Sequence, residues 1–385
     1  MRCLFIPLIA WLCLILTGCS STNKITRYSN IGTNARLVYR DKYELPYAMN
    51  FKNSVVGGLS GIDYDREHDQ YFLISDDPAA HGPSRYYTAK IGLSNKGIDS
   101  VVLTEMTPLL NTEGLAYSDV RKDRAHSLDA EAMRYIPSLR EIVYSSEGQR
   151  LEDKDKKWTI QNPTIYIARL DGTFKDSFEL PQNMYMHQTE YGPRHNSVFE
   201  GLTLSNDQRS MFVSVEEPLY QDGPRVATGD STALIRFLKF DMHSRKQVAQ
   251  YAYRIEAVPY PPTPSNAFKI NGVSDILYAG HDKFLVIERA FMTGRKSTSI
   301  RIYLADAGDA NDISSVPALT SFQDIKSISK KLLFNLEDLH IYIDNIEGVT
   351  FGPQLPNGHQ SLLLVSDDNF SSAQTSQFFL FEFIP

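Results

Sequence analysis

The sequence predicts an all-β protein, and more specifically a single β-propeller with five blades. Three observations support this prediction. Helical periodicity is scarce, and strand-like runs bounded by Gly, Pro, Asn and Asp recur along the whole chain. The strand-favouring residues Tyr and Phe are abundant, at 21 and 20 copies. The third and most specific observation is an internal repeat that contains no helix.

The repeat has five copies of one pattern. A small or acidic residue opens a short strand, a turn follows, and an apolar strand then ends in acid. The copies are Ser60–Asp77, Glu131–Gly148, Glu200–Glu217, Ser274–Arg289 and Glu347–Asp368. Their opening residues lie 71, 69, 74 and 73 positions apart. A regular period of this length indicates a propeller or a solenoid.

Each period holds enough strand-like runs for one four-stranded blade. The second, for example, contains AMRYI, EIVYSSE, TIYIARL and FKDSFEL. The fifth contains only three, so we expect Ala35–Leu45 to supply the fourth strand, closing the ring and leaving no open sheet edge. Six blades remain possible if a degenerate blade lies in a long insertion. The insertions are Pro181–Asn196, Pro218–Asp230 and Ala257–Asn271.

The first residues resemble a bacterial lipoprotein signal. Met1–Arg2 carries a positive charge, and the apolar run Cys3–Leu16 has 14 residues, fewer than the roughly 20 that span a bilayer. Leu16-Thr17-Gly18-Cys19 resembles the lipobox, in which the Cys receives the lipid. We therefore expect a signal peptide at 1–18, lipidated Cys19 with a flexible tether at 19–34, and the propeller at 35–385.

The signal predicts a location in the cell envelope, with attachment to the membrane through the lipid alone. Ser20 rather than Asp follows Cys19, which by analogy with sorting rules favours the outer membrane; the face stays open. All three cysteines (Cys3, Cys13 and Cys19) lie in the signal region, so the mature domain has no disulfide. A net charge of -7 without a Lys/Arg-rich run argues against a nucleic-acid partner, and we expect a monomer.

The repeats place acids at one mouth of the predicted channel. The first strand of a blade lines the channel and the second runs antiparallel to it, so the start of one and the end of the other share a rim. The start positions are Ser60, Glu131, Glu200, Ser274 and Glu347. The end positions are Asp76, Glu147, Glu216, Glu288 and Asp367. A second acid follows in three blades, as Asp77, Glu217 and Asp368, whereas Gly148 and Arg289 follow in the others.

Carboxylates this close either raise their pKa values or bind cations. Oxygen-rich clusters without histidine suit hard divalent ions, so Ca²⁺ is the first expectation and Mg²⁺ the second, with the end-position acids and the second acids as ligands. The alternative is architectural. An acid at a strand end can accept backbone N–H bonds from its own turn or from the next blade.

These motifs together resemble the bacterial phytase-like family, also described as "esterase-like activity of phytase". The resemblance rests on GGLSGIDYD, DAEAM, FEGLTLS, GVSDILY and NIEGVTFGP with the apolar strands that follow them, and it covers about residues 55 to 385. It implies a propeller rich in Glu and Asp with phosphoester- or ester-hydrolysing activity on a small substrate. The chain departs from the pattern at DAEAM, where Asp-x-Glu-Gly is expected, and at Gly148.

Residues that would act on such a substrate follow from the predicted mouth. Glu131, Glu200 and Glu347 are the candidate catalytic acids beside the metal. His126 and His195 each precede a motif Glu by five residues, and His195 is the preferred general acid. Arg289 either binds an anionic substrate or pairs with Glu288 or another acid. Further cations are expected in loops over the mouth, namely Arg85, Arg124, Arg194, Arg295 and Lys296.

The sequence lacks the G-x-S-x-G, H-E-x-x-H, C-x-x-C and G-x-x-x-x-G-K motifs, which disfavours a serine hydrolase, a zinc enzyme or a P-loop enzyme. A metal-dependent phosphoesterase is the first functional prediction. A non-catalytic propeller that binds a protein or glycan around structural Ca²⁺ is the second, and a lactonase-like calcium propeller is the third. Fold alone does not choose among them.

Overall fold

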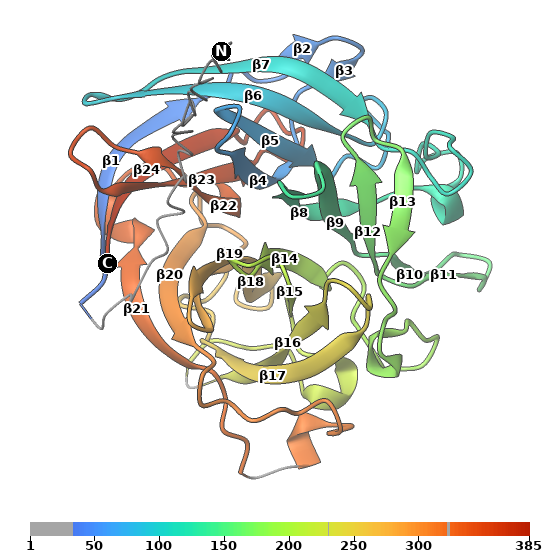
Figure 1. The fold of residues 1–385 in the computed structure, drawn as a ribbon. Helices are drawn as coiled ribbons and strands as arrows, with labels where there is room; N and C mark the ends of the chain where they lie inside the picture. The colour runs from blue at the N-terminus through green and yellow to red at the C-terminus, as the bar shows by residue number, and fades with distance from the viewer. Residues whose placement is uncertain (1–33, 230, 322–323) are drawn as a thin grey trace, which may run out of the picture.

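The structure is a computed structural model that describes residues 34–229, 231–321 and 324–385. Five four-stranded antiparallel sheets are arranged as blades around a central channel (Figure 1). This confirms the predicted five-bladed β-propeller. The alternative of six blades is wrong, since the described residues form no sixth four-stranded sheet.

In every blade the strands follow one another outward from the channel. The innermost strands are β4 (Leu59–Asp65), β8 (Ala130–Ile136), β14 (Phe199–Leu204), β18 (Lys269–Gly280) and β22 (Asn345–Gln354). The second strands are β5 (Gln70–Ser75), β9 (Glu141–Ser146), β15 (Ser210–Val215), β19 (Lys283–Met292) and β23 (Gln360–Asp367). The third strands are β6 (Arg85–Ser94), β12 (Thr164–Arg169), β16 (Ala233–Asp241), β20 (Ser299–Asp306) and β24 (Gln377–Ile384). The outermost strands are β7 (Gly97–Pro108), β13 (Phe174–Ser177), β17 (Gln247–Ile255), β21 (Ser329–Asn335) and β1 (Arg36–Glu44).

Short elements decorate the blades. Two hairpins stand outside them, β2 (Asn50–Phe51) with β3 (Ser54–Val55) and β10 (Gln149–Glu152) with β11 (Trp158–Gln161). The described helices are all one-turn 3₁₀ segments. They are η1 (Arg124–His126), η2 (Gln182–Met184), η3 (Tyr220–Asp222), η4 (Leu319–Ser321) and η5 (Leu336–Leu339).

The ring closes as expected, through the strand nearest the N-terminus. β1 pairs antiparallel with β24, from Arg36 opposite Ile384 to Glu44 opposite Gln377. Blade five therefore contains β22, β23 and β24 from the end of the chain and β1 from its beginning (Figure 1). Such closure satisfies a sheet edge that would otherwise be open.

The core lies between neighbouring blades, because each sheet has an apolar face toward both of its neighbours. Five large clusters of buried side chains occupy the five interfaces, one at each. The second strands are buried on both faces, which explains why YFLIS, MFVSV and SLLLV read as continuous apolar runs without alternation.

A buried ion pair on the channel axis connects all five blades. Arg134 on β8 donates from Nη2 to both carboxylate oxygens of Asp275 on β18, at 3.0 and 2.9 Å. Its other hydrogen bonds reach the carbonyl oxygens of Ile62 on β4 and Val349 on β22. Asp275 in turn accepts the backbone N–H of Leu202 on β14 and of Val349. This central pair fixes the distances between the innermost strands.

The predicted signal peptide, Cys19 and the tether as far as residue 33 lie outside the described residues. The lipoprotein prediction therefore stays a prediction. Within the described part of the chain, no helix has the length and apolar character needed to cross a membrane.

Candidate functional site

A β-bulge marks the start of every blade. In each blade the pairing between the first and second strand shifts register close to the mouth, and these shifts include Ser60, Glu131, Glu200, Ser274 and Glu347. A bulge leaves its extra residue unpaired and redirects the side chain. At each predicted start position, the regular pairing of the two strands therefore does not fix the direction of the side chain.

The serine and glutamate members use this freedom differently. Ser60 Oγ donates to the carbonyl oxygens of Ala130 and Glu131, at 3.3 and 3.0 Å, and Ser274 Oγ donates to that of Ile346 at 2.9 Å. Each serine therefore joins its blade to the next. The three glutamates have longer side chains, which reach the acids at the ends of the second strands.

The end positions contain four acids and one arginine. The end position is the residue on the second strand that follows the partner of the last first-strand residue before the bulge. In blades one, two, three and five this residue is Asp76, Glu147, Glu216 and Asp367, respectively. In blade four Val273 pairs with Glu288, so the corresponding residue is Arg289, which lies opposite Gly272. The prediction from the sequence that Glu288 occupies the end position of blade four is therefore wrong by one residue.

Glu288 accordingly lies away from the other acids. Its carboxylate accepts hydrogen bonds from Tyr253 Oη at 2.9 Å, the Glu256 backbone N–H at 3.0 Å and Asn271 Nδ2 at 3.0 Å, and it pairs with Lys330 Nζ at 2.5 Å. These partners join the strands of blades three and four. Glu288 therefore has a structural role, because other residues of the protein already occupy its carboxylate.

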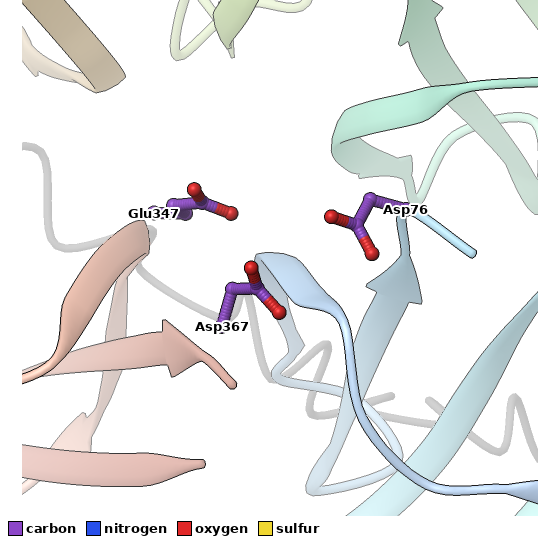
Figure 2. A group of neighbouring side chains, drawn as sticks. All are labelled: Asp76, Glu347 and Asp367. Carbon is purple, nitrogen blue, oxygen red and sulfur yellow. The ribbon is translucent and has the colours of Figure 1, made fainter. Parts of the chain in front are cut away.

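Asp76, Glu347 and Asp367 form a first acidic triad where blades one and five meet. One carboxylate oxygen from each lies within 4.8 Å of the others. The three carboxylates point into one common space (Figure 2). Asp367 Oδ1 accepts the Asn369 backbone N–H, whereas the described residues offer no hydrogen bond to the Asp76 carboxylate.

Asp129, Glu131 and Glu147 form a second triad, also within 4.8 Å, at the mouth side of blade two. Glu147 Oε1 accepts the Val198 backbone N–H, but Glu147 Oε2 is buried and has no hydrogen-bond partner. The sequence analysis missed Asp129, although the motif DAEAM contains it. Asp129 lies two residues before the bulge, at the position that Asn345 occupies in blade five.

Glu200, Glu216 and Arg289 complete the mouth. Arg289 donates from Nη2 to Glu216 Oε1 at 2.8 Å and from Nη1 to Glu347 Oε1 at 2.7 Å and to Asn345 Oδ1 at 2.6 Å. It is thus a fixed positive charge between blades three and five. Of the described residues, none forms a hydrogen bond with the carboxylate of Glu200, which is buried.

Burial and mutual repulsion raise the pKa values of these acids. Burial, followed by the charge of Glu347, raises the pKa of Asp76 well above its usual value. Burial also raises the pKa of Glu131, Glu147, Glu200 and Asp367 well above the ordinary range, with neighbouring carboxylates adding to it.

Where Arg289 is close, the effect is smaller. Burial raises the pKa of Glu216 to about 7 and that of Glu347 to about 8, although Arg289 opposes the increase. For Asp129, burial raises the pKa to about 6. The mouth therefore holds eight carboxyl groups that cannot all ionise without added positive charge.

The predicted second acids lie in structural bonds. Asp77 forms a fully buried ion pair with Arg85 at 2.6 Å. Glu217 accepts from Ser197 Oγ at 2.6 Å and pairs with Arg225 at 2.8 Å. Asp368 Oδ1 accepts the backbone N–H groups of Gly58 and Phe370, both at 3.1 Å. The bonds of Asp77 and Asp368 match the architectural alternative, so we place these two acids outside the candidate cation ligands. Glu217 Oε1, by contrast, is buried and has no hydrogen-bond partner among the described residues.

A cavity of about 1120 Å³ adjoins the acids on the side of blades three to five. Glu216 and Arg289 lie at the boundary between the cavity and the acidic mouth. The predicted loop residues Arg194, His195, Arg295 and Lys296 line it, together with Arg225. Arg85, by contrast, is buried against Asp77, and His126 is exposed and pairs with Asp123.

His195 enters the cavity as a neutral ring. Burial, with smaller contributions from Arg124 and Arg150, lowers its pKa below the usual value, and its buried Nδ1 has no hydrogen-bond partner. A neutral imidazole can accept a proton, so this environment favours a base over the predicted general acid.

The donor set fits a hard divalent cation. Every candidate ligand atom is a carboxylate oxygen, with no sulfur or imidazole nitrogen in either triad. The buried, unpartnered Glu147 Oε2 is an independent indication, because a buried carboxylate oxygen without a partner is costly. Asp76, Glu347 and Asp367 would hold one cation, and Asp129, Glu131 and Glu147 would hold another.

A curated relative from Arthroderma benhamiae, described as an uncharacterized secreted protein, is 27% identical over 196 residues, which is 48% of this chain. The chain spans only 35% of the length of that relative.

Similar solved structures have low identity. They include an endo-arabinase from Bacteroides thetaiotaomicron (9% identity, TM-score 0.43, 89% of this chain and 98% of that one). Another is a periplasmic gluconolactonase from Pseudomonas aeruginosa (10% identity, TM-score 0.35, 86% and 90%). At these values the similarities carry no argument about function. The family model described as "Phytase-like: Esterase-like activity of phytase" matches residues 54–370, and the chain therefore belongs to the phytase-like family.

Proposed function

We propose that this chain is a hydrolase of phosphate esters that depends on a divalent cation, with Ca²⁺ as the first candidate and Mg²⁺ as the second. The observation that supports the proposal most is the pair of acidic triads beside a cavity lined by cationic side chains. Family membership supports a hydrolytic or esterase-like role in general. The choice of phosphate esters rests on the charges around the cavity.

Bound in the triads, a divalent cation would neutralise phosphate oxygens and lower the pKa of a water molecule. The chain itself supplies the rest of the site. Asp76, Glu131 and Glu200, whose carboxylates lack hydrogen-bond partners in the described residues, remain available as ligands or as proton acceptors. Arg289 holds Glu216 and Glu347 in place through its guanidinium, and its charge also attracts an anionic substrate to the mouth.

The cavity residues orient the substrate. Arg225 and Lys296 present positive charge on the walls of the cavity, where they favour an anionic ester. Neutral His195 is suited to accept a proton from an attacking water or to hydrogen-bond the leaving oxygen once protonated. Between the inner strands, one to three residues beyond the bulges, the Arg134–Asp275 pair occupies the channel axis, so substrate would enter from the acidic mouth.

We also propose that the protein works in the cell envelope, anchored through lipidated Cys19 and otherwise outside the membrane. The N-terminal sequence supports this, and the similar protein from Arthroderma benhamiae is described as secreted. Cys19→Ala should release the protein from the membrane fraction and abolish labelling with an acyl donor. Unchanged fractionation and an unlabelled wild type would overturn the anchor.

The experiment that tests the activity is hydrolysis of a phosphomonoester and of a carboxylic ester by chelator-treated protein, with Ca²⁺ or Mg²⁺ added back. We expect phosphomonoester turnover with Ca²⁺, and its loss in Glu200→Gln and Glu347→Gln. Glu113→Gln, which removes one exposed carboxylate that belongs to neither triad and does not line the cavity, is the matched control. Stabilisation by Ca²⁺ without turnover of either ester would favour a binding propeller with a structural cation. Turnover of only the carboxylic ester, or of a lactone, would favour the lactonase-like alternative.

A further inference from the structure

Blade four differs from the other blades in how far it extends at the mouth. In the other four blades the second strand ends at or just before the mouth position, at Ser75, Ser146, Val215 and Asp367. β19 instead continues for three residues after Arg289, to Met292. β18 begins correspondingly early, so that Asn271, Ile270 and Lys269 pair with Ala290, Phe291 and Met292.

This extension carries apolar side chains into the cavity. Arg289 and Phe291 are two residues apart on one strand, so their side chains lie on the same face of the sheet. Ile270 lies opposite Phe291, and both line the cavity with Arg289. The ring of Phe268 lies 6.0 Å from that of Phe291 and continues the surface. We call Phe268, Ile270 and Phe291 the apolar wall.

The apolar wall is exposed yet fixed. Phe268 is 55% and Phe291 is 40% exposed. The Thr293 backbone N–H donates to the Phe268 carbonyl oxygen at 3.0 Å, and Thr293 Oγ1 donates to the same atom at 2.9 Å. Single exposed apolar residues are ordinary, but a contiguous, preformed apolar surface beside convergent charged groups is typical of a ligand site.

Charge complementarity indicates which ligand would cover this wall. The cavity lining contains five Arg and Lys side chains against the three acids Glu190, Glu216 and Asp344, and this excess of positive charge favours an anionic group, while the wall offers no hydrogen bond to hydroxyl groups. We propose that the substrate is a phosphate ester whose alcohol part is apolar, an alkyl or arylalkyl phosphate, and that the apolar wall holds this part. The proposal rests on the proposed function and names its substrate class.

The test compares two substrates with primary alcohol leaving groups, so that the chemistry of bond cleavage is alike. We expect 2-phenylethyl phosphate to exceed glycerol 1-phosphate in kcat/KM by roughly tenfold, mainly through KM, because the phenyl group is buried on the wall. The double variant Phe268→Ser/Phe291→Ser should reduce this preference to about threefold or less, mainly through a higher KM for 2-phenylethyl phosphate. Val248→Ser/Leu332→Ser, which removes two exposed apolar residues from the outer strands β17 and β21, is the control.

A binding measurement separates the two proposals. We expect 3-phenylpropylphosphonate, which cannot be hydrolysed, to bind the Ca²⁺-loaded protein more tightly than methylphosphonate, with the difference lost in the wall variant. Equal kcat/KM for both substrates, or a preference that survives the wall variant, would overturn the inference and leave the hydrolase proposal intact. Wall-dependent phosphonate binding without hydrolysis would support the wall and overturn the hydrolase. Neither hydrolysis nor a binding preference would overturn both.

Discussion

The channel of this propeller contains two ionic arrangements that use the same residue types in opposite ways. On the axis, Arg134 and Asp275 form a buried pair whose hydrogen bonds reach all five innermost strands. At the mouth, eight carboxyl groups surround one arginine, and several of their oxygens have no partner among the described residues.

The difference separates a pair of opposite charges that neutralise each other from a group of like charges that do not, and the second arrangement is the one for which we propose a cation. A buried charge with its hydrogen bonds satisfied is tolerated, whereas buried like charges destabilise the protein until something neutralises them. Two of the second acids follow the first rule. Asp77 and Asp368 lie next to Asp76 and Asp367 in sequence, yet their bonds are filled by Arg85 and by backbone N–H groups.

Among the substitutions, breaking the central pair should have the largest effect. Asp275→Ala leaves Arg134 buried without its carboxylate, and we expect it to lower the free energy of unfolding by about 3–5 kcal/mol. Urea denaturation measures the change, with Glu113→Gln as the control. The loss should be the same with and without Ca²⁺, and a loss below about 1 kcal/mol would show that the axis is not held by this pair.

The stability of the metal-free protein should depend on pH because of the carboxyl groups at the mouth. Burial raises the pKa of Glu347 from 4.5 to about 8 and that of Glu216 to about 7. A carboxyl with a higher pKa in the folded state binds more protons when folded, so the stability that it contributes is lost as pH rises through this window.

We therefore expect these two groups to lower the stability without metal by up to about 6 kcal/mol between pH 5 and pH 8. Saturating Ca²⁺ should flatten this dependence, because the cation replaces the protons. Chemical denaturation at several pH values, in chelator and in Ca²⁺, measures both. Stability that rises with pH in chelator would contradict the raised pKa values.

A smaller effect of opposite sign to that of Asp275→Ala is expected from a single acid at the mouth. Glu131→Gln removes one of the repelling charges, so it should raise the stability of the metal-free protein at pH 8 by about 1 kcal/mol. The same change should weaken stabilisation by Ca²⁺, because Glu131 belongs to a candidate triad. Thermal unfolding in chelator and in Ca²⁺ gives both values. Destabilisation in chelator would indicate a structural role for Glu131 instead.

We expect a substitution of Glu288 to have no effect on cation binding. Its carboxylate is occupied by Lys330, Tyr253 and Asn271. Glu288→Gln should therefore leave the Ca²⁺-induced increase in Tm unchanged, even if it lowers Tm itself. A reduced calcium response, comparable to that of Glu131→Gln, would place Glu288 among the ligands and contradict the strand register.

The repeats in the sequence were sufficient to predict the five blades, their strands and the closing strand Ala35–Leu45. Each of these follows from apolar runs at a constant period, and burial on both faces makes such runs continuous. The position of the mouth also followed from the repeats, because the start and end positions of a blade meet at one rim.

The individual ligands were harder to predict. An acid that accepts a backbone N–H and an acid with a free oxygen have the same sequence signature, so Asp368 could not be distinguished from Asp367. The end position predicted for blade four was wrong by one residue. Both Glu288 and Arg289 end an apolar run, and only the bulge at Ser274 shows which of them occupies the end position. Asp129 was not predicted because the second copy of the repeat was taken to begin at Glu131, two residues later.

The central claim is that the mouth carboxylates form a cation site, and calorimetric titration of Ca²⁺ into chelator-treated protein tests it most directly. We expect the wild type to bind Ca²⁺ with release of protons at pH 7.5, since several ligands have raised pKa values. The double variant Glu131→Gln/Glu347→Gln, which removes one acid from each triad, should bind at least about a hundredfold more weakly while keeping its circular dichroism spectrum. Wild-type protein that takes up no Ca²⁺, or a double variant with the same affinity and proton release, would contradict the account.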